Sequence, residues 1–232
     1  MNAPLPSFAI PSVPIAGSRE RFAVRHIYCV GRNYAEHAKE MGGDAAKEPP
    51  FFFTKAADSI VPVVPPEVGR IRYPLATSNF HHELELVVAI GKSGVNVAAE
   101  HANEYVFGYA VGLDMTRRDV QGEAKKLGRP WDMGKGFDQS APCAPITPAS
   151  KSGHIGKGAI WLKVNGEIRQ QGDINQLIWS VAETISYLSG YITLAPGDLI
   201  YSGTPAGVGA VKKGDRLEGH VDGLTDLAIT IG

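Results

Sequence analysis

The run ELELVVAI at residues 83–90 constrains the fold more than any other segment of the sequence. Its apolar residues predict a buried β-strand that ends at Gly91. Because side chains alternate across a strand, Glu83 and Glu85 share one face. Two such carboxylates repel each other and resist burial, and a hard cation between them would relieve both effects. Considered alone, the motif is explained slightly better by an acidic stripe that faces solvent.

A third carboxylate, Asp114, follows the apolar run 106–113, where a strand is expected to give way to a helix. Ligands gather at such ends, because the backbone fixes the side chain and leaves space above it. Three carboxylates, without cysteine or a spaced histidine pair, favour Mg²⁺ or Mn²⁺ over zinc. The alternative is that Asp114 is an acid that only flanks the helix.

The rest of the chain is rich in strands and turns, with few helices. Further strands are expected at 24–30, 51–55 and 105–113. Asn165-Gly166 predicts a two-residue hairpin. Three helices are expected, each with a capping side chain at its start and a glycine near its end, at 33–42, 116–128 and 173–190. Without the regular βα alternation of Rossmann and TIM-barrel folds, this order predicts a mixed, β-rich α+β domain.

Composition bounds the compartment and the partners. Hydrophobic residues make up 44% of the 232 residues, enough for one domain with its own core. Lys and Arg number 23 against 24 Asp and Glu, so we expect no surface for nucleic acid or a membrane. Neither a signal peptide nor an apolar run of about 20 residues is visible. We therefore expect a cytoplasmic protein whose 2 cysteines are buried and reduced.

Residues 1–21 contain Pro4, Pro6, Pro11 and Pro14, which disfavour helix and predict an extended arm. The rest of the chain, 22–232, is expected to form a single domain.

His37 and Glu40 lie three residues apart and would share one face of the expected short helix. An imidazole oriented by a carboxylate is a workable general base for water. A surface contact between the two is the commoner explanation for such a pair. The neighbouring Gly42-Gly43 segment is typical of lids that bring a base to the substrate, which favours a functional role.

Two glycine-flanked features complete the candidates. Lys135 lies between Gly134 and Gly136, where backbone can approach a ligand closely, although most lysines simply face water. The stretch 202–209 resembles a backbone nest that can hold a carboxylate, and a glycine-rich hairpin connection is its alternative.

Several motifs occur in a fixed order from about residue 24 to the C-terminus. They are GRNYAEHAKE at 31–40, ELELVVAIGK at 83–92, GYAVGLDMTRRDVQ at 108–121, GKGFD at 134–138, GDLIYSGTPAGVG at 197–209 and KGD at 213–215. Together they resemble the fumarylacetoacetate hydrolase family. The sequence departs from the family where alanine follows Lys55 in place of a frequent proline, and it matches only loosely at 138–145.

This resemblance implies a β-roll of mixed sheets, a homodimer and one Mg²⁺ or Mn²⁺ per subunit. It assigns the metal to Glu83, Glu85 and Asp114. It assigns catalysis to the His37–Glu40 pair and to Lys135. Gln121 and Thr204 match substrate-contacting positions, whereas Arg32 and Arg118 fit either substrate contacts or structural ion pairs.

The segments HHELEL at 81–86 and RRDVQ at 117–121 further resemble the fumarylpyruvate hydrolases of gentisate degradation. The expected substrate is therefore a small diketo acid, cleaved by water into fumarate and pyruvate. Alternatives within the same fold are an acetylpyruvate hydrolase, an oxaloacetate decarboxylase, and a dienoate isomerase or decarboxylase. A non-catalytic binding protein with a structural cation is the alternative from another class.

Overall fold

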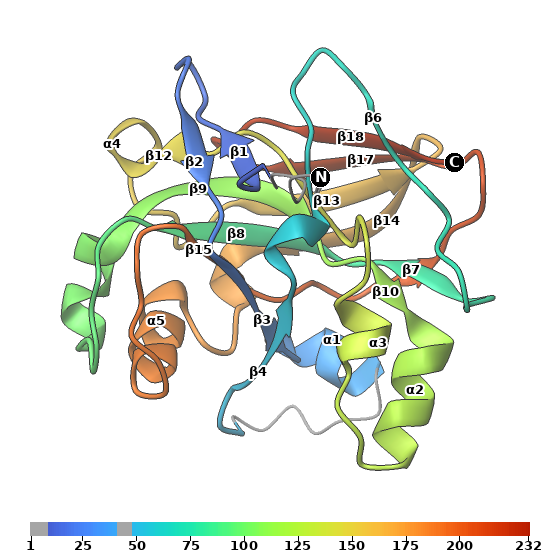
Figure 1. Ribbon diagram of the computed structural model, residues 1–232, viewed down its shortest axis with the longest axis horizontal. Coiled ribbons are helices and arrows are strands. Elements are labelled where there is room, and N and C mark those ends of the chain that lie inside the picture. Colours follow the sequence, from blue (N-terminus) through green and yellow to red (C-terminus); the bar gives the residue numbers. More distant parts are fainter. Residues whose placement is uncertain (1–8, 41–47) are drawn as a thin grey trace, which may run out of the picture.

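A computed structural model describes residues 9–40 and 48–232, with the backbone alone at 38–40 (Figure 1). Its largest sheet is mixed and has 8 strands. The order is β4 (Phe51–Lys55), β3 (His26–Gly31), β15 (Asp198–Tyr201), β8 (Leu84–Ile90), β9 (Val106–Leu113), β11 (Ala141–Cys143) and β5 (Ile60–Pro62), and β12 (Thr147–Pro148) pairs with β9. β15 runs parallel to β3, whereas β8 and β9 are antiparallel.

Strand β8 is buried on both of its faces. Leu86 and Val88 belong to one hydrophobic cluster, while Val87 and Ala89 belong to a second cluster. This explains why the segment is a nearly continuous apolar run rather than an alternating one.

A second sheet of 5 strands packs against one face of the first. Its order is β14 (Glu167–Asp173), β13 (Ala159–Val164), β17 (Arg216–Val221), β18 (Leu227–Ile231) and β6 (Gly69–Ile71). The sheets approach so closely that a Cβ on Gly219 would lie 2.5 Å from Leu84 Cδ1. With its mixed sheets and few helices, the structure confirms the predicted β-rich α+β class.

Two smaller pairings complete the strands. The first is a 3-stranded sheet in the order β10 (Thr116–Arg117), β7 (Phe80–His82) and β16 (Gly209–Ala210). The second is an antiparallel pair of β1 (Ser12–Pro14) and β2 (Arg21–Ala23), so this part of the expected arm is extended. Residues 1–8 lie outside the described part of the chain.

The helices are short. They are α1 (Ala35–Glu40), α2 (Arg118–Lys126), α3 (Asp132–Lys135), α4 (Ala149–Ser152) and α5 (Val181–Ser189), with 3-10 turns η1 (Ala57–Ser59), η2 (Ala99–Tyr105) and η3 (Ile174–Gln176). In Figure 1, α1, α2 and α3 lie in the same part of the molecule, and α3 contacts both α2 and β4. No helix in residues 9–40 and 48–232 is long and apolar enough to cross a membrane.

The hairpin prediction is confirmed, and the helix at 173–190 is corrected. Asn165 and Gly166 both have positive φ, at 53° and 85°, and connect β13 to β14. Asp173 caps as expected and forms a capping box with Gln176, but that box caps only η3. A second box between Ser180 and Glu183 starts α5, because the backbone leaves the helical region between the two.

The other two residues expected to cap helices, Asn33 and Thr116, make other contacts instead. The Asn33 side chain bonds the backbone of Trp179 and the carbonyl of Ser202, and thereby connects distant loops. The Thr116 hydroxyl donates to the carbonyl of Asp114, and α2 begins at Arg118 instead. The expected end of the first helix at Gly42 lies outside the described residues.

Candidate active site

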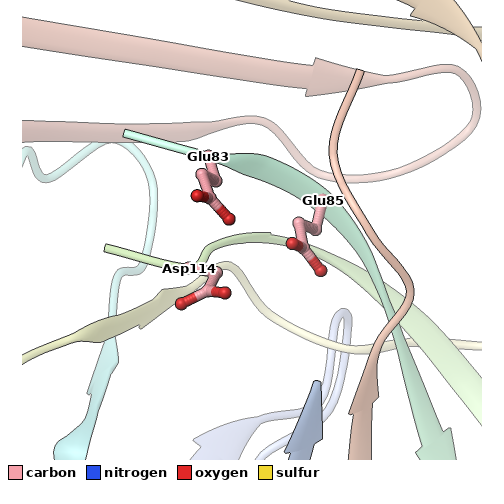
Figure 2. A group of neighbouring side chains, drawn as sticks. All are labelled: Glu83, Glu85 and Asp114. Atoms are coloured by element: carbon pink, nitrogen blue, oxygen red, sulfur yellow. The ribbon is translucent and has the colours of Figure 1, made fainter. Parts of the chain in front are cut away.

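Three carboxylates converge at one edge of the β8–β9 pair (Figure 2). The antiparallel register pairs Leu84 with Leu113, so Glu83 and Asp114 fall opposite each other. A hydrogen bond of 2.8 Å from the Asp114 amide to the Glu83 carbonyl continues that ladder. Glu85 is two residues further along β8 and therefore points to the same side as Glu83. Ligand atoms of all three residues lie within 4.8 Å of one another, and all three side chains are buried.

Three cations contact this cluster. Lys135 Nζ lies 2.8 Å from Glu83 Oε2 and 2.7 Å from Asp114 Oδ2. Lys55 Nζ lies 2.8 Å from Asp114 Oδ1, and the Arg118 guanidinium donates to Glu83 Oε1. Both lysine side chains are almost completely buried. The chain itself therefore compensates part of the negative charge.

Burial and these charges shift the pKa values of Glu83 and Glu85 in opposite directions. Although burial alone would raise the pKa of Glu83, Lys135 and Arg118 hold that pKa far below its usual value. Burial raises the pKa of Glu85 well above its usual value, and the carboxylates of Asp114 and Glu83 add to the increase. Burial alone would lower the pKa of Lys135, but Asp114 and Glu83 raise it, so its ammonium form is retained.

The cluster fits a hard divalent cation. Its donors are three carboxylates, the ligand type that Mg²⁺ and Mn²⁺ prefer. Asp114 Oδ1 is buried and contacts the Lys55 ammonium at 2.8 Å, but it accepts no hydrogen bond in the described part of the chain. The raised pKa of Glu85 marks a carboxyl that lacks sufficient positive charge. A cation bound here would supply that charge and use the open oxygen.

A cavity opens above the cluster. It is lined by eight of the predicted site residues: Arg32, His37, Glu83, Glu85, Arg118, Gln121, Lys135 and Thr204. Asp114 is 0% exposed and contacts Lys135. Phe53, Lys125 and Trp131 complete much of the wall. His37 is itself mostly buried, whereas the Glu40 side chain lies outside the described residues.

Comparison with known proteins identifies the family. The model of the fumarylacetoacetate (FAA) hydrolase C-terminal domain matches residues 26–232. The chain belongs to the fumarylacetoacetate hydrolase family. A fumarylpyruvate hydrolase from Ralstonia sp. is 47% identical over 190 residues, which cover 82% of this chain and 96% of that protein. The human mitochondrial oxaloacetate tautomerase is 44% identical over 207 residues, with coverage of 89% and 91%.

A solved member of the family has nearly the same fold. The crystal structure of a fumarylpyruvate hydrolase from Pseudomonas aeruginosa, in complex with Mn²⁺ and pyruvate, superposes with a TM-score of 0.97. The two chains are 55% identical, and the match covers 99% of each.

Local backbone features accompany two of the predicted site residues, Arg32 and Lys135. Arg32 has a φ of 54°, which is uncommon for a residue with a side chain. Its guanidinium lies 5.8 Å from the centre of the Phe51 ring, and that ring packs so tightly on Gly31 that no Cβ would fit there. Gly134 allows α3 to contact the backbone of Gln121, which brings Lys135 and Gln121 to the same cavity.

The glycine-rich stretch 202–209 holds a carboxylate, but the carboxylate belongs to the protein. The Gly203 amide donates to Glu85 Oε2 at 2.8 Å. Gly203 has a φ of 104°, and a Cβ there would lie 2.6 Å from the Asn33 Cβ. The loop therefore positions a predicted metal ligand.

We expect Gly203→Ala to lower the free energy of unfolding by at least about 2 kcal/mol, because both the backbone angle and the space exclude a methyl group. Urea unfolding would measure the loss. Gly223→Ala is the matched control, since Gly223 also has positive φ, at 80°, but nothing lies within 4 Å of its added Cβ. An equal loss in both variants would show that crowding at Gly203 contributes nothing.

Besides the wall residues Phe53, Lys125 and Trp131, sequence reasoning missed two residues that contact the predicted site, Lys55 and Gln170. Lys55 contacts Asp114 and also donates to the carbonyls of Met115 and Lys135. The available signal was a lysine at the end of the aromatic run 51–55, which was expected to be a strand. Gln170 hydrogen-bonds Thr204 from a strand of the other sheet, and no local pattern marks it.

Proposed function

We propose that this protein is a fumarylpyruvate hydrolase that cleaves fumarylpyruvate into fumarate and pyruvate. The observation that carries the proposal is the buried cluster of Glu83, Glu85 and Asp114 beneath a cavity that His37 and Lys135 also reach. The two fumarylpyruvate hydrolases at 47% and 55% identity support it, as does the Mn²⁺ and pyruvate of the solved relative.

Glu83, Glu85 and Asp114 would hold one Mg²⁺ or Mn²⁺ per subunit. When bound, such a cation supplies Lewis-acid stabilisation of negative charge on the pyruvoyl oxygens. Lys135 adds a fixed ammonium beside the same carboxylates, so it is available to the same developing charge without reorganisation.

His37 acts as the general base in this proposal, with Glu40 as the residue that orients it. His37 removes a proton from water, and the water oxygen bonds to the C4 carbonyl carbon of the substrate. The C3–C4 bond then breaks, which gives fumarate and the enolate of pyruvate. A proton added at C3 completes pyruvate, so one water is consumed for each substrate cleaved.

The substrate also carries a carboxylate at its fumaryl end, and the structure favours Arg32 over Arg118 as its partner. Arg118 is engaged by Glu83 Oε1 and, at 2.6 Å, by Gln121 Oε1. Arg32 lies on the cavity wall and contacts the Phe51 ring rather than a carboxylate of the described residues. Gln121 and Thr204 remain for polar contacts with the pyruvoyl end.

We expect Arg32→Ala to reduce kcat/KM for fumarylpyruvate by about 10- to 100-fold more than for acetylpyruvate, which ends in a methyl group. Steady-state kinetics of the variant and the unmodified protein on both substrates gives the two losses of kcat/KM to be compared. Arg169→Ala is a suitable control, because Arg169 is exposed and pairs with Glu167. If both substrates lost the same factor, Arg32 would not recognise the acyl end.

An oxaloacetate tautomerase is the second candidate, because a relative with that activity is 44% identical over most of the chain. Oxaloacetate shares the pyruvoyl end with fumarylpyruvate, so the same carboxylate cluster and Lys135 would serve it. We further propose a cytoplasmic homodimer that acts in gentisate-type degradation of aromatic compounds.

The deciding experiment follows the diketo-enolate absorbance of fumarylpyruvate with purified protein and Mn²⁺, and again after EDTA. Equal amounts of fumarate and pyruvate that form only with the metal would support the proposal. Absence of fumarate, together with catalysed enol–keto exchange of oxaloacetate, would favour the second candidate. Turnover confined to acetylpyruvate would leave the cleavage chemistry in place and change the substrate.

A further inference from the structure

Gln170 lies on β14 between exposed neighbours, yet its own side chain is fully buried. Its carboxamide points between the two sheets toward the strand that carries the acidic cluster. The oxygen Oε1 accepts from the Leu84 amide at 3.0 Å and faces His82 Nδ1 at 3.0 Å. The nitrogen Nε2 donates to Thr204 Oγ1 at 2.7 Å and to the Pro205 carbonyl at 2.8 Å.

These four contacts permit only one orientation of the amide. The Leu84 amide can only donate, so the atom that faces it is the oxygen. The Pro205 carbonyl can only accept, so the atom that faces it is the nitrogen. Turning the amide over would place two donors face to face at Leu84 and two acceptors face to face at Pro205. Both hydrogens of Nε2 are then committed, one to Pro205 and the other to Thr204.

The consequence falls on the Thr204 hydroxyl. Because Thr204 Oγ1 accepts from Gln170, its own proton points elsewhere. Thr204 lines the cavity, and no described residue accepts that proton. The preceding residue, Gly203, bonds Glu85, so the hydroxyl is held beside the acidic cluster.

We propose that Gln170 is a positioning residue that makes the Thr204 hydroxyl a fixed hydrogen-bond donor to an oxygen of the substrate's pyruvoyl end. The proposal rests on the function proposed above, because it takes an α-keto acid as the occupant of the cavity. Gln170 does not touch the substrate itself. It acts by removing the alternative in which Thr204 donates to the protein.

Gln170→Glu tests this with little change of shape. The carboxylate still accepts from Leu84 and His82, but it has no hydrogen to give to Thr204. The hydroxyl of Thr204 would then donate to Glu and turn away from the cavity. Pyruvate binding to the Mn²⁺-loaded protein, measured by calorimetry, reports the loss directly. Gln171→Glu, at an exposed neighbour on the same strand, controls for the added charge.

A double-mutant cycle with Thr204→Val separates positioning from other effects. We expect Thr204→Val and Gln170→Glu each to weaken pyruvate binding about tenfold or more, as for the loss of a hydrogen bond to a charged group. We expect the double variant to bind pyruvate no more weakly than the worse single variant, within about twofold. Thr204→Ser, which keeps the hydroxyl, should retain nearly full affinity.

Two kinds of result would overturn the proposal. Losses that multiply in the double variant would mean that Gln170 acts through charge or general structure, which overturns the proposal. Unchanged affinity in either single variant would overturn it as well. Should Gln170→Glu fail to fold, Gln170→Met enters the same cycle, and its loss must likewise vanish beside Thr204→Val. An unmodified protein that takes up Mn²⁺ but does not bind pyruvate would refute the proposed function and this inference together, whereas a failed cycle alone leaves the function standing.

Discussion

His37→Ala is expected to lower kcat for fumarylpyruvate by about 100- to 10,000-fold, which is the usual contribution of a positioned acid or base. The loss would follow because the change removes the side chain on the cavity wall that we propose deprotonates water. The affinity for Mn²⁺ should change only a few-fold, because the proposed ligands are the carboxylates of the cluster. Stopped-flow or steady-state assays give the rate, and calorimetry gives the metal affinity.

His101→Ala is the matched control, since His101 is largely exposed and pairs with Glu104 on the surface. Turnover preserved in His37→Ala would eliminate His37 as the base. A parallel loss of Mn²⁺ binding would instead place His37 in the metal site.

Lys135→Met is expected to affect both turnover and stability. Removing the ammonium leaves Glu83 Oε2 and Asp114 Oδ2 buried without that partner, which costs about 3–5 kcal/mol in comparable sites. The rate should fall by about 100- to 1,000-fold, because the change removes the preorganised positive charge that we propose stabilises the enolate. Thermal unfolding without and with Mn²⁺ should show a larger deficit without the metal, since a bound cation replaces part of the missing charge.

Lys157→Met, at an exposed position, should change neither quantity. If Lys135→Met and the unmodified protein had the same melting temperature in the absence of metal, the assigned ion pairs would be contradicted.

The carboxylate cluster was accessible from the sequence because it depends on local rules. The period of two along a strand placed Glu83 and Glu85 on one face, and the end of the next apolar run supplied Asp114. Only the pairing register, in which Leu84 faces Leu113, had to be added by the structure. The family resemblance supplied the roles, which residue patterns alone left open.

The residues that support the cluster could not be predicted in the same way. Lys55 reaches Asp114 across 59 positions of sequence, and Gln170 reaches Thr204 from a strand of another sheet. Such contacts depend on how the sheets pack, which no local period encodes. The helix expected from Asp173 was wrong for a related reason. Its capping pattern was real, but a second cap at Ser180 competed for the start of the helix.

The three cations around the acidic cluster affect how metal binding and substrate binding influence each other. Once all three are ionised, as metal ligands must be, Glu83, Glu85 and Asp114 carry three negative charges, and Lys55, Lys135 and Arg118 bring three positive ones to Glu83 and Asp114. A divalent ion therefore arrives at a neutral neighbourhood and leaves it with a surplus of two. A diketo dianion cancels that surplus. Metal and substrate should accordingly bind with positive cooperativity, each raising the other's affinity by the same factor, as thermodynamic linkage requires.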